Sequence, residues 1–320
     1  MIAAWLPLAL LAYFMLAANG TIDRIIVHKE VTKPVVVSFW VAVFSVPTIA
    51  ILLVGLLPVP FADEFTYVAP NASQLLKIIA SGFMVQAALL FMYKALHDSE
   101  ATRVLSAMGA IVPIVTLVAS YFLLNERLGR LSALAVVVLI LGTVTLTLKT
   151  TKKTRRLGSQ WIVNTILASF VFALQSVIIK QVYDEFHFIS AFALMSLGAL
   201  LYLMVLVLAS RHVRELVIPH GHGAPKAKKD TKSQVVLIFI NSMLGGVAVI
   251  ILNAAIAQGS PTLVNSLRGV QYAAIFVIAV MLANKHPHLL DEELSKRSVI
   301  QKISGIMLVT IGVAILAAAT

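Results

Sequence analysis

Apolar and polar positions divide the 320-residue chain into ten long apolar runs separated by short polar segments. A helix needs about 20 residues to cross the hydrocarbon core of a bilayer. Backbone groups in lipid must be satisfied within the protein, and uninterrupted apolar runs do not suit barrel strands, so we predict helices. The predicted spans are 2–23, 35–57, 72–96, 101–124, 131–149, 160–183, 188–209, 234–257, 261–284 and 300–318.

Composition supports this assignment, since 60% of the residues are hydrophobic and only 12% are charged. A soluble domain carries roughly 25% charged residues. The net charge of +11 would suit nucleic-acid binding, but the cations lie in short loops, where they meet lipid headgroups. No basic segment precedes the first run, which begins at Ile2, so we expect a helix rather than a signal peptide. The sequence predicts an all-α polytopic membrane protein that contacts the lipid bilayer and no nucleic acid.

Residues of the first half recur in the same order in the second half. The matching pairs are Trp5 with Trp161, Asn19 with Gln175, Thr102 with Thr262, Ser106 with Ser266, Gly109 with Gly269 and Gly142 with Gly312. Chance similarity among apolar helices is the alternative to a duplication. We predict a first five-helix repeat over 1–150, a basic linker over 151–159 and a second five-helix repeat over 160–320. Because each repeat has an odd number of spans, the second must lie inverted in the membrane.

Loop charges predict the orientation. The basic stretches 149–156 and 211–232 fall on one side of the predicted topology, and both should be solvated loops. The segment 58–71 on the other side carries Asp63 and Glu64. The positive-inside rule places the basic loops in the cytoplasm and both termini outside. We expect the membrane to be the cytoplasmic membrane of a bacterium or archaeon.

Two segments around the end of span four carry a family resemblance. They are Ser106-Ala-Met-Gly-Ala-Ile-Val-Pro113 and Tyr121-Phe-Leu-Leu-Asn-Glu126-Arg127-Leu128. Small residues, a mid-helix proline and a Glu-Arg pair that closes the span resemble the EamA-type family of the drug/metabolite transporter superfamily, over nearly the whole chain. The resemblance implies export or exchange of small metabolites and cytoplasmic termini, which conflicts with the loop charges. The second half departs from the pattern, with Ala273 and Lys285-His286 in place of the proline and the Glu-Arg pair.

Arg268 is the sharpest candidate for a binding residue, because it lies about two turns inside span nine. A charged side chain at membrane depth costs about 2.5–3.5 kcal/mol on insertion scales. Asn265, Arg268 and Tyr272 fall at i, i+3 and i+7 on one helix face, with Gln271 beside them. Such a face suits a carboxylate or phosphate group. The alternative is that Arg268 reaches the interface or pairs with an acid elsewhere.

Other polar and small residues are weaker candidates. The amides Asn19 and Gln175 and the hydroxyls Ser106 and Ser266 could contact substrate, or could form hydrogen bonds between helices. The candidates for hinge or packing residues are Pro113, Gly245 and Gly246. We expect the Glu126-Arg127 pair to pair locally or to cap the turn.

Catalytic patterns are missing from the sequence. It has no cysteine, no His-Glu-x-x-His pair, no Gly-x-Ser-x-Gly elbow and no phosphate-binding glycine loop. We therefore predict no enzyme activity, no resident metal and no cofactor. The leading hypothesis is a secondary transporter or facilitator that moves a small metabolite, anionic or zwitterionic, by alternating access. A flippase for a lipid-linked substrate and a non-transporting scaffold subunit are the alternatives, and a homodimer is left open.

Overall fold

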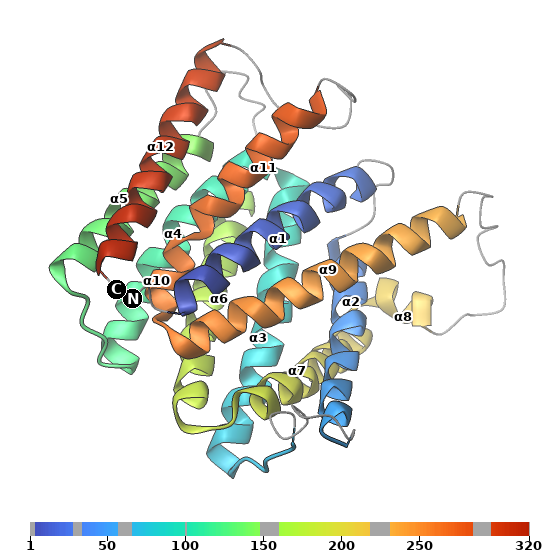
Figure 1. Ribbon diagram of the computed structural model, residues 1–320. Helices are drawn as coiled ribbons and strands as arrows, with labels where there is room; N and C mark the ends of the chain where they lie inside the picture. The colour runs from blue at the N-terminus through green and yellow to red at the C-terminus, as the bar shows by residue number, and fades with distance from the viewer. Residues whose placement is uncertain are drawn as a thin grey trace.

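The computed structural model describes residues 4–27, 34–56, 66–99, 101–147, 160–217, 231–283 and 296–319. Within these ranges the chain forms helices joined by turns (Figure 1). The helices are α1 Trp5–Val27, α2 Pro34–Ser45, the 3₁₀ helix η1 Val46–Leu56, α3 Ala72–Asp98, α4 Ala101–Leu123, α5 Arg130–Thr147, α6 Gln160–Glu185, α7 Phe188–Ala209, α8 Arg211–Val217, α9 Thr231–Gln258, α10 Pro261–Ser266, α11 Arg268–Ala283 and α12 Lys296–Ala319.

Every predicted span is occupied by helix, which confirms the all-α membrane architecture. Of the described spans, six are long and apolar enough to cross a bilayer by themselves, and α4, α5 and α9 contain shorter apolar stretches. Large apolar side chains on the outer surface, such as Phe122, Leu208 and Met281, are exposed. In a soluble protein such a surface would aggregate, whereas here it meets lipid.

Two spans are not continuous α-helices, a detail that the sequence analysis did not address. Span two changes from α2 to the 3₁₀ helix η1 next to Pro47, which lacks an amide hydrogen and crowds the preceding turn. Span nine is divided into α10 and α11 at Leu267. The expectation that 211–232 is only a loop is also wrong, because α8 occupies Arg211–Val217 and α9 begins at Thr231.

Local sequence explains several helix ends. Asn71 begins α3 with a capping box: its side chain accepts from the Gln74 amide at 2.9 Å, and the Gln74 side chain accepts from the Asn71 amide at 3.0 Å. Ser260 caps α10, and Pro261 occupies the first turn, where a missing amide costs nothing. After α4, Asn125 adopts a left-handed backbone conformation with φ of 53°.

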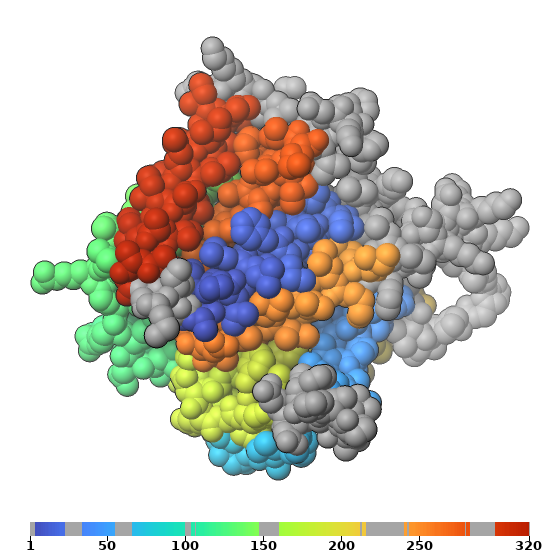
Figure 2. Space-filling model, in the orientation of Figure 1, coloured from blue at the N-terminus to red at the C-terminus, as the bar shows by residue number. Residues whose placement is uncertain are grey.

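Two groups of three helices form the body of the protein. In one, α1 packs against α9 and α11; in the other, α6 packs against α3 and α4. Figure 2 shows α1 between α9 and α11 on one face of the molecule. Spans one, eight and nine form the first group, and spans six, three and four form the second. These spans correspond to one another in the two predicted repeats, so exchanging the repeats converts one group into the other. Each group thus takes one helix from the opposite repeat, which supports the inverted arrangement.

Close helix contacts complete the frame. The helices α5 and α12, spans five and ten, pack along their length. A Cβ on Gly142 of α5 would lie 2.8 Å from the Val309 amide nitrogen of α12. Gly82 of α3 and Gly198 of α7 meet backbone to backbone. Small residues allow such approach, which supplies much of the attraction between helices in lipid.

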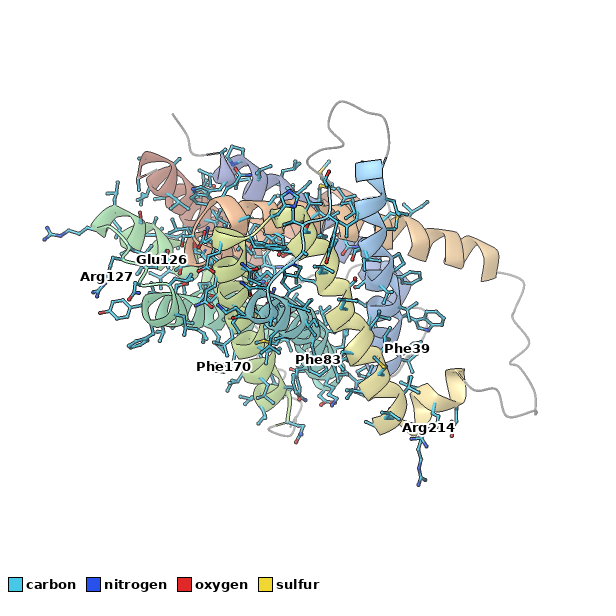
Figure 3. The ribbon with its side chains drawn as sticks, turned by 90° about the horizontal axis from the view of Figure 1, so that it is seen from below. Phe39, Phe83, Glu126, Arg127, Phe170 and Arg214 are labelled. Carbon is cyan, nitrogen blue, oxygen red and sulfur yellow. The ribbon has the colours of Figure 1, made fainter. Side chains whose placement is uncertain are left out.

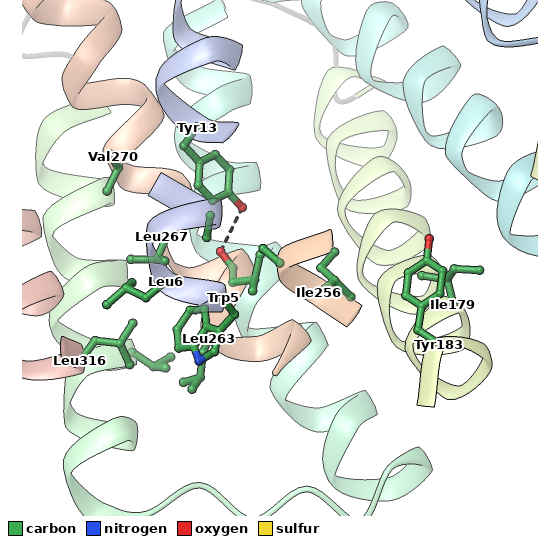
Figure 4. Close-up of a cluster of buried hydrophobic side chains, with 14 of the residues drawn as sticks. Trp5, Leu6, Tyr13, Ile179, Tyr183, Ile256, Leu263, Leu267, Val270 and Leu316 are labelled. Carbon is green, nitrogen blue, oxygen red and sulfur yellow. Dashed lines mark hydrogen bonds between the residues drawn. The ribbon is translucent and has the colours of Figure 1, made fainter. Parts of the chain in front are cut away.

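The two ends of the molecule carry different segments. Both ends of the described chain lie on one side, together with the turns 124–129 and 259–260 (Figure 1). We call this side the terminal end. In Figure 3, Glu126 and Arg127 lie at this end and Arg214 of α8 lies far from them. The largest buried apolar cluster contains Trp5, Leu6 and Leu316 and is drawn in Figure 4.

Candidate functional site

Span nine bends at the residue immediately before Arg268. The Leu267 amide bonds to the Val264 carbonyl at 3.1 Å, and the Val270 amide bonds to the Leu267 carbonyl at 2.9 Å. These i to i−3 bonds tighten the helix into a 3₁₀-like turn, which often marks a functional hinge. Arg268 therefore begins α11. The sequence spacing placed Arg268 near mid-membrane, but it gave no sign of this break.

Tyr13 of α1 forms a hydrogen bond to the break in span nine between α10 and α11. Its hydroxyl donates to the Val264 carbonyl at 3.0 Å, and the side chain is fully buried (Figure 4). Arg268 is a charged neighbour of the same hydroxyl. Sequence analysis missed Tyr13, because one tyrosine in an apolar span is not a distinctive signal. It connects α1 to the α10–α11 break and to the candidate cation at once.

The Arg268 guanidinium lies among aromatic side chains from three helices. Its central carbon is 5.6 Å from the ring centroid of Phe172 on α6, and the hydroxyls of Tyr13 and Tyr272 are its neighbours. Its Nε is buried and has no hydrogen-bond partner. Within the described ranges, no carboxylate forms an ion pair with Arg268. The alternative that Arg268 pairs with an acid is thus unsupported by these residues, and part of its donor capacity is unused.

Asn265 and Arg268 contact different side chains. Its Nδ2 donates to Thr116 Oγ1 at 3.2 Å and to Ser176 Oγ at 2.9 Å, and the side chain is 4% exposed. This network joins α10 to α4 and α6. We interpret Asn265 as the polar connection between the two helix groups beside Arg268. Thr116 and Ser176 were not among the residues predicted from sequence.

Small residues bring α4 and α11 close to Thr143 of α5. A Cβ on Gly109 would lie 2.5 Å from Thr143 Cγ2 and 3.0 Å from Tyr272 Cε2. A Cβ on Gly269 would clash with Thr143 Oγ1. Gly109 and Gly269 thus flank one threonine, and Gly109 also leaves room for the Tyr272 ring.

The remaining predicted residues occupy separate environments. Gln271 Nε2 donates to the Leu16 carbonyl at 3.4 Å, and Asn19 Nδ2 donates to the Asn241 carbonyl at 2.9 Å. Ser266 Oγ donates to the Leu263 carbonyl of its own helix at 2.7 Å. Gln175 is buried on α6. The side chain of Ser106 lies outside the described part of the structure. Contact of these residues with a substrate stays a prediction.

The candidate hinge residues fall inside helices. Pro113 is buried in α4, and Gly245 and Gly246 lie within the continuous helix α9. A Cβ on Gly245 would lie 3.0 Å from Asn19 Nδ2, whereas one on Gly246 would meet nothing within 4 Å. Close packing thus explains Gly245, and it does not explain Gly246.

The hydroxyl of Tyr13 permits a direct test of how the break is held. Tyr13→Phe removes the donor to the Val264 carbonyl and keeps the buried ring. We expect a loss of about 1 kcal/mol in the free energy of unfolding, the net worth of such a hydrogen bond. Chemical denaturation in detergent, with Tyr67→Phe at an exposed tyrosine as the control, measures the difference. Equal stability of Tyr13→Phe and the parent protein would contradict a structural role for this bond.

Comparisons with known proteins agree with this architecture. Residues 3–148 match the EamA-like transporter family. A crystal structure of another protein has a TM-score of 0.65 over 99% of both chains at 12% sequence identity, which shows the same fold alone. No curated protein matches the chain. Groups of three or more His, Cys, Asp or Glu side chains that could hold a metal do not occur among the described residues.

Proposed function

We propose that the protein is a secondary transporter or facilitator whose substrate bears a negative charge. The match of residues 3–148 to the EamA-like transporter family supports membrane transport. The charge of the substrate and the route are our proposal. The substrate is a small anionic or zwitterionic metabolite, and it crosses by alternating access between the two helix groups.

The environment of Arg268 carries this proposal: among the described residues its guanidinium has no carboxylate partner, and its buried Nε has no hydrogen-bond partner. A cation at membrane depth is costly unless a partner or water compensates it. Arg268 has the faces and hydroxyls of aromatic side chains beside it, and a buried Nε without a partner. Aromatic faces attract a cation but leave its N–H donors free for a planar carboxylate or a phosphate. The Tyr272 hydroxyl can also donate to the same anionic group, whereas the one hydrogen of the Tyr13 hydroxyl is donated to the Val264 carbonyl.

The inverted repeat supports alternating access. Two similar halves that face opposite ways can exchange conformations, and this exchange moves access from one side to the other. Span nine bends at Leu267, directly before Arg268, so a change at this bend would reorient the cation. We also propose, from the basic stretches 149–156 and 211–232, that the end opposite the termini is cytoplasmic.

A ligand-stabilisation experiment tests the substrate class. Melting temperatures of the parent protein, Arg268→Ala and Arg268→Lys are measured in detergent against a panel of amino acids, organic acids, sugar phosphates and cations. A ligand that binds only the folded state adds about 2.7 kcal/mol at 100 times its dissociation constant. We expect anionic or zwitterionic compounds to stabilise the parent and not Arg268→Ala. Arg268→Lys keeps the charge but not the planar fork, so its response should be intermediate.

Arg130→Ala serves as the matched control, because Arg130 is an exposed cation at the start of α5. It should respond to ligands as the parent does. A lower melting temperature of Arg268→Ala, with no compound that distinguishes the variants, would make Arg268 a structural residue. Stabilisation by lipid-linked compounds alone would support the flippase alternative instead.

A further inference from the structure

The hydrogen bonds that join the two helix groups gather in the half of the molecule nearer the terminal end. Lys180 of α6 donates to the Ala257 carbonyl of α9 at 2.8 Å, and the Tyr183 hydroxyl donates to Asn253 Oδ1 at 3.0 Å. Both pairs lie in the last turns of their helices. Together with the Asn265 network they fasten the group of α6 to the group of α9.

Glu126 supplies the outermost of these connections. Its carboxylate accepts hydrogen bonds from Ser260 Oγ and, at 3.3 Å, from Thr262 Oγ1. The expectation that Glu126 pairs or caps locally is therefore wrong, because it reaches from the α4–α5 turn to the start of α10. Arg127, its sequence neighbour, instead lies 4.3 Å from the centroid of the Tyr121 ring. Hydrogen bonds to an ionised carboxylate are roughly twice as strong as neutral ones.

The backbone turn before Glu126 explains how the side chain reaches α10. Asn125, at φ of 53°, reverses the chain after α4, and the Glu126 amide then bonds to the Ser120 carbonyl at 3.2 Å. Asparagine tolerates this left-handed conformation better than most residues. Glu126 is held at its own backbone, so its carboxylate connects two fixed elements.

Helix packing shows the same asymmetry between the ends. On α3, Gly82 packs directly against the backbone of α7, whereas the repeat counterpart of this pair, α9 with α2, has far less contact. Gly246 of α9 faces open space in the described structure. When a helix pair packs closely and its counterpart in an inverted repeat does not, the protein is in one of two conformations that the repeats can exchange.

We infer that Glu126 is a latch that holds the terminal end shut, and that its bonds to Ser260 and Thr262 break when this end opens. The inference rests on the proposed alternating-access function. In the conformation described, hydrogen bonds fasten the two groups at the terminal end. Opening the terminal end must separate the α4–α5 turn from α10, and Glu126 spans that boundary.

The absence of cysteine from the sequence permits a labelling test. Ser120→Cys places one thiol on α4, behind the latch, at a side chain that is 0% exposed. Its hydroxyl has no hydrogen-bond partner, so the thiol replaces no bond. The rate of reaction with a charged, membrane-impermeant maleimide is measured in Ser120→Cys alone and combined with Glu126→Ala, Glu126→Gln or Glu185→Gln. Glu185 is an exposed carboxylate at the end of α6, on the same side of the molecule, and is the matched control.

We expect Glu126→Ala to raise the labelling rate at least about tenfold, which corresponds to 1.4 kcal/mol in the opening equilibrium. Glu126→Gln keeps an acceptor oxygen without the charge and should raise the rate less. Glu185→Gln should leave it unchanged. Ser196→Cys, a second buried reporter on α7, should label slowly in every variant.

Three results would overturn the inference: equal labelling of Ser120→Cys with and without Glu126, an equal rise with Glu185→Gln, or a parallel rise at Ser196→Cys. The last would show that loss of Glu126 loosens the whole fold. The labelling uses no substrate, so it does not depend on Arg268. If Arg268→Ala retains all ligand responses while Glu126→Ala exposes Ser120→Cys, the substrate class fails and the latch stands.

Discussion

Gly198→Ala is expected to lower the free energy of unfolding by about 3 kcal/mol, the upper part of the usual range for overpacking. A Cβ at this position would clash with the Ile79 carbonyl oxygen and would lie 2.5 Å from the Phe83 amide nitrogen, both on α3. Backbone atoms cannot move aside by changing a rotamer. The helices α3 and α7 would have to separate, and they would lose packing along the contact.

The control for this substitution is Gly246→Ala on α9. No atom lies within 4 Å of the Cβ that it adds, and alanine favours a helix over glycine by about 1 kcal/mol. Gly246→Ala should therefore leave the stability unchanged or raise it. Denaturation of both variants in the same detergent gives the two differences. Equal stability of Gly198→Ala and Gly246→Ala would contradict the close packing of α3 against α7.

The fold was largely predictable because membrane insertion constrains it so strongly. The length of each apolar run and the need to satisfy backbone groups inside lipid leave few alternatives to helices, and the order of matched residues indicated the repeat. The break at Leu267 could not be predicted in this way. It depends on a hydroxyl from α1, Tyr13, which is 251 residues away from Val264 in the chain. Hydrophobic spacing contains no information about such a contact.

The candidate site was predicted in part, for the same reason. Burial of a lone arginine in an apolar span has a high free-energy cost. Arg268 was therefore a candidate on energetic grounds, without any sequence motif. Phe172, Tyr13 and Thr116 were missed, since aromatic and hydroxyl side chains are common in membrane helices. Glu126 was noticed but assigned a local role. Its partners Ser260 and Thr262 lie in the other repeat, and only the packing of the two groups brings them together.

The contact between α5 and α12 gives a second prediction with a large effect. A Cβ on Gly142 would lie 2.8 Å from the Val309 amide nitrogen, whereas one on Gly312 would lie 2.6 Å from Leu139 Cγ, a side-chain atom that a rotamer change can move. Gly142→Ala should therefore cost about 2–3 kcal/mol, and Gly312→Ala about 1 kcal/mol. The two positions match in the predicted repeat. A difference in stability between the two variants therefore reflects the atoms that each Cβ meets.

The double variant Gly142→Ala/Gly312→Ala separates two explanations of these costs. The Cβ on Gly142 meets the Val309 backbone and pushes α5 away from α12, and the Cβ on Gly312 meets Leu139 at nearly the same level of this contact. Once one substitution has widened the spacing, the second should find room, and the combined loss should fall short of the sum by at least about 0.5 kcal/mol. Denaturation of the four proteins gives this coupling directly. Strict additivity would mean that each alanine is accommodated locally, and that the two helices do not move apart as a pair.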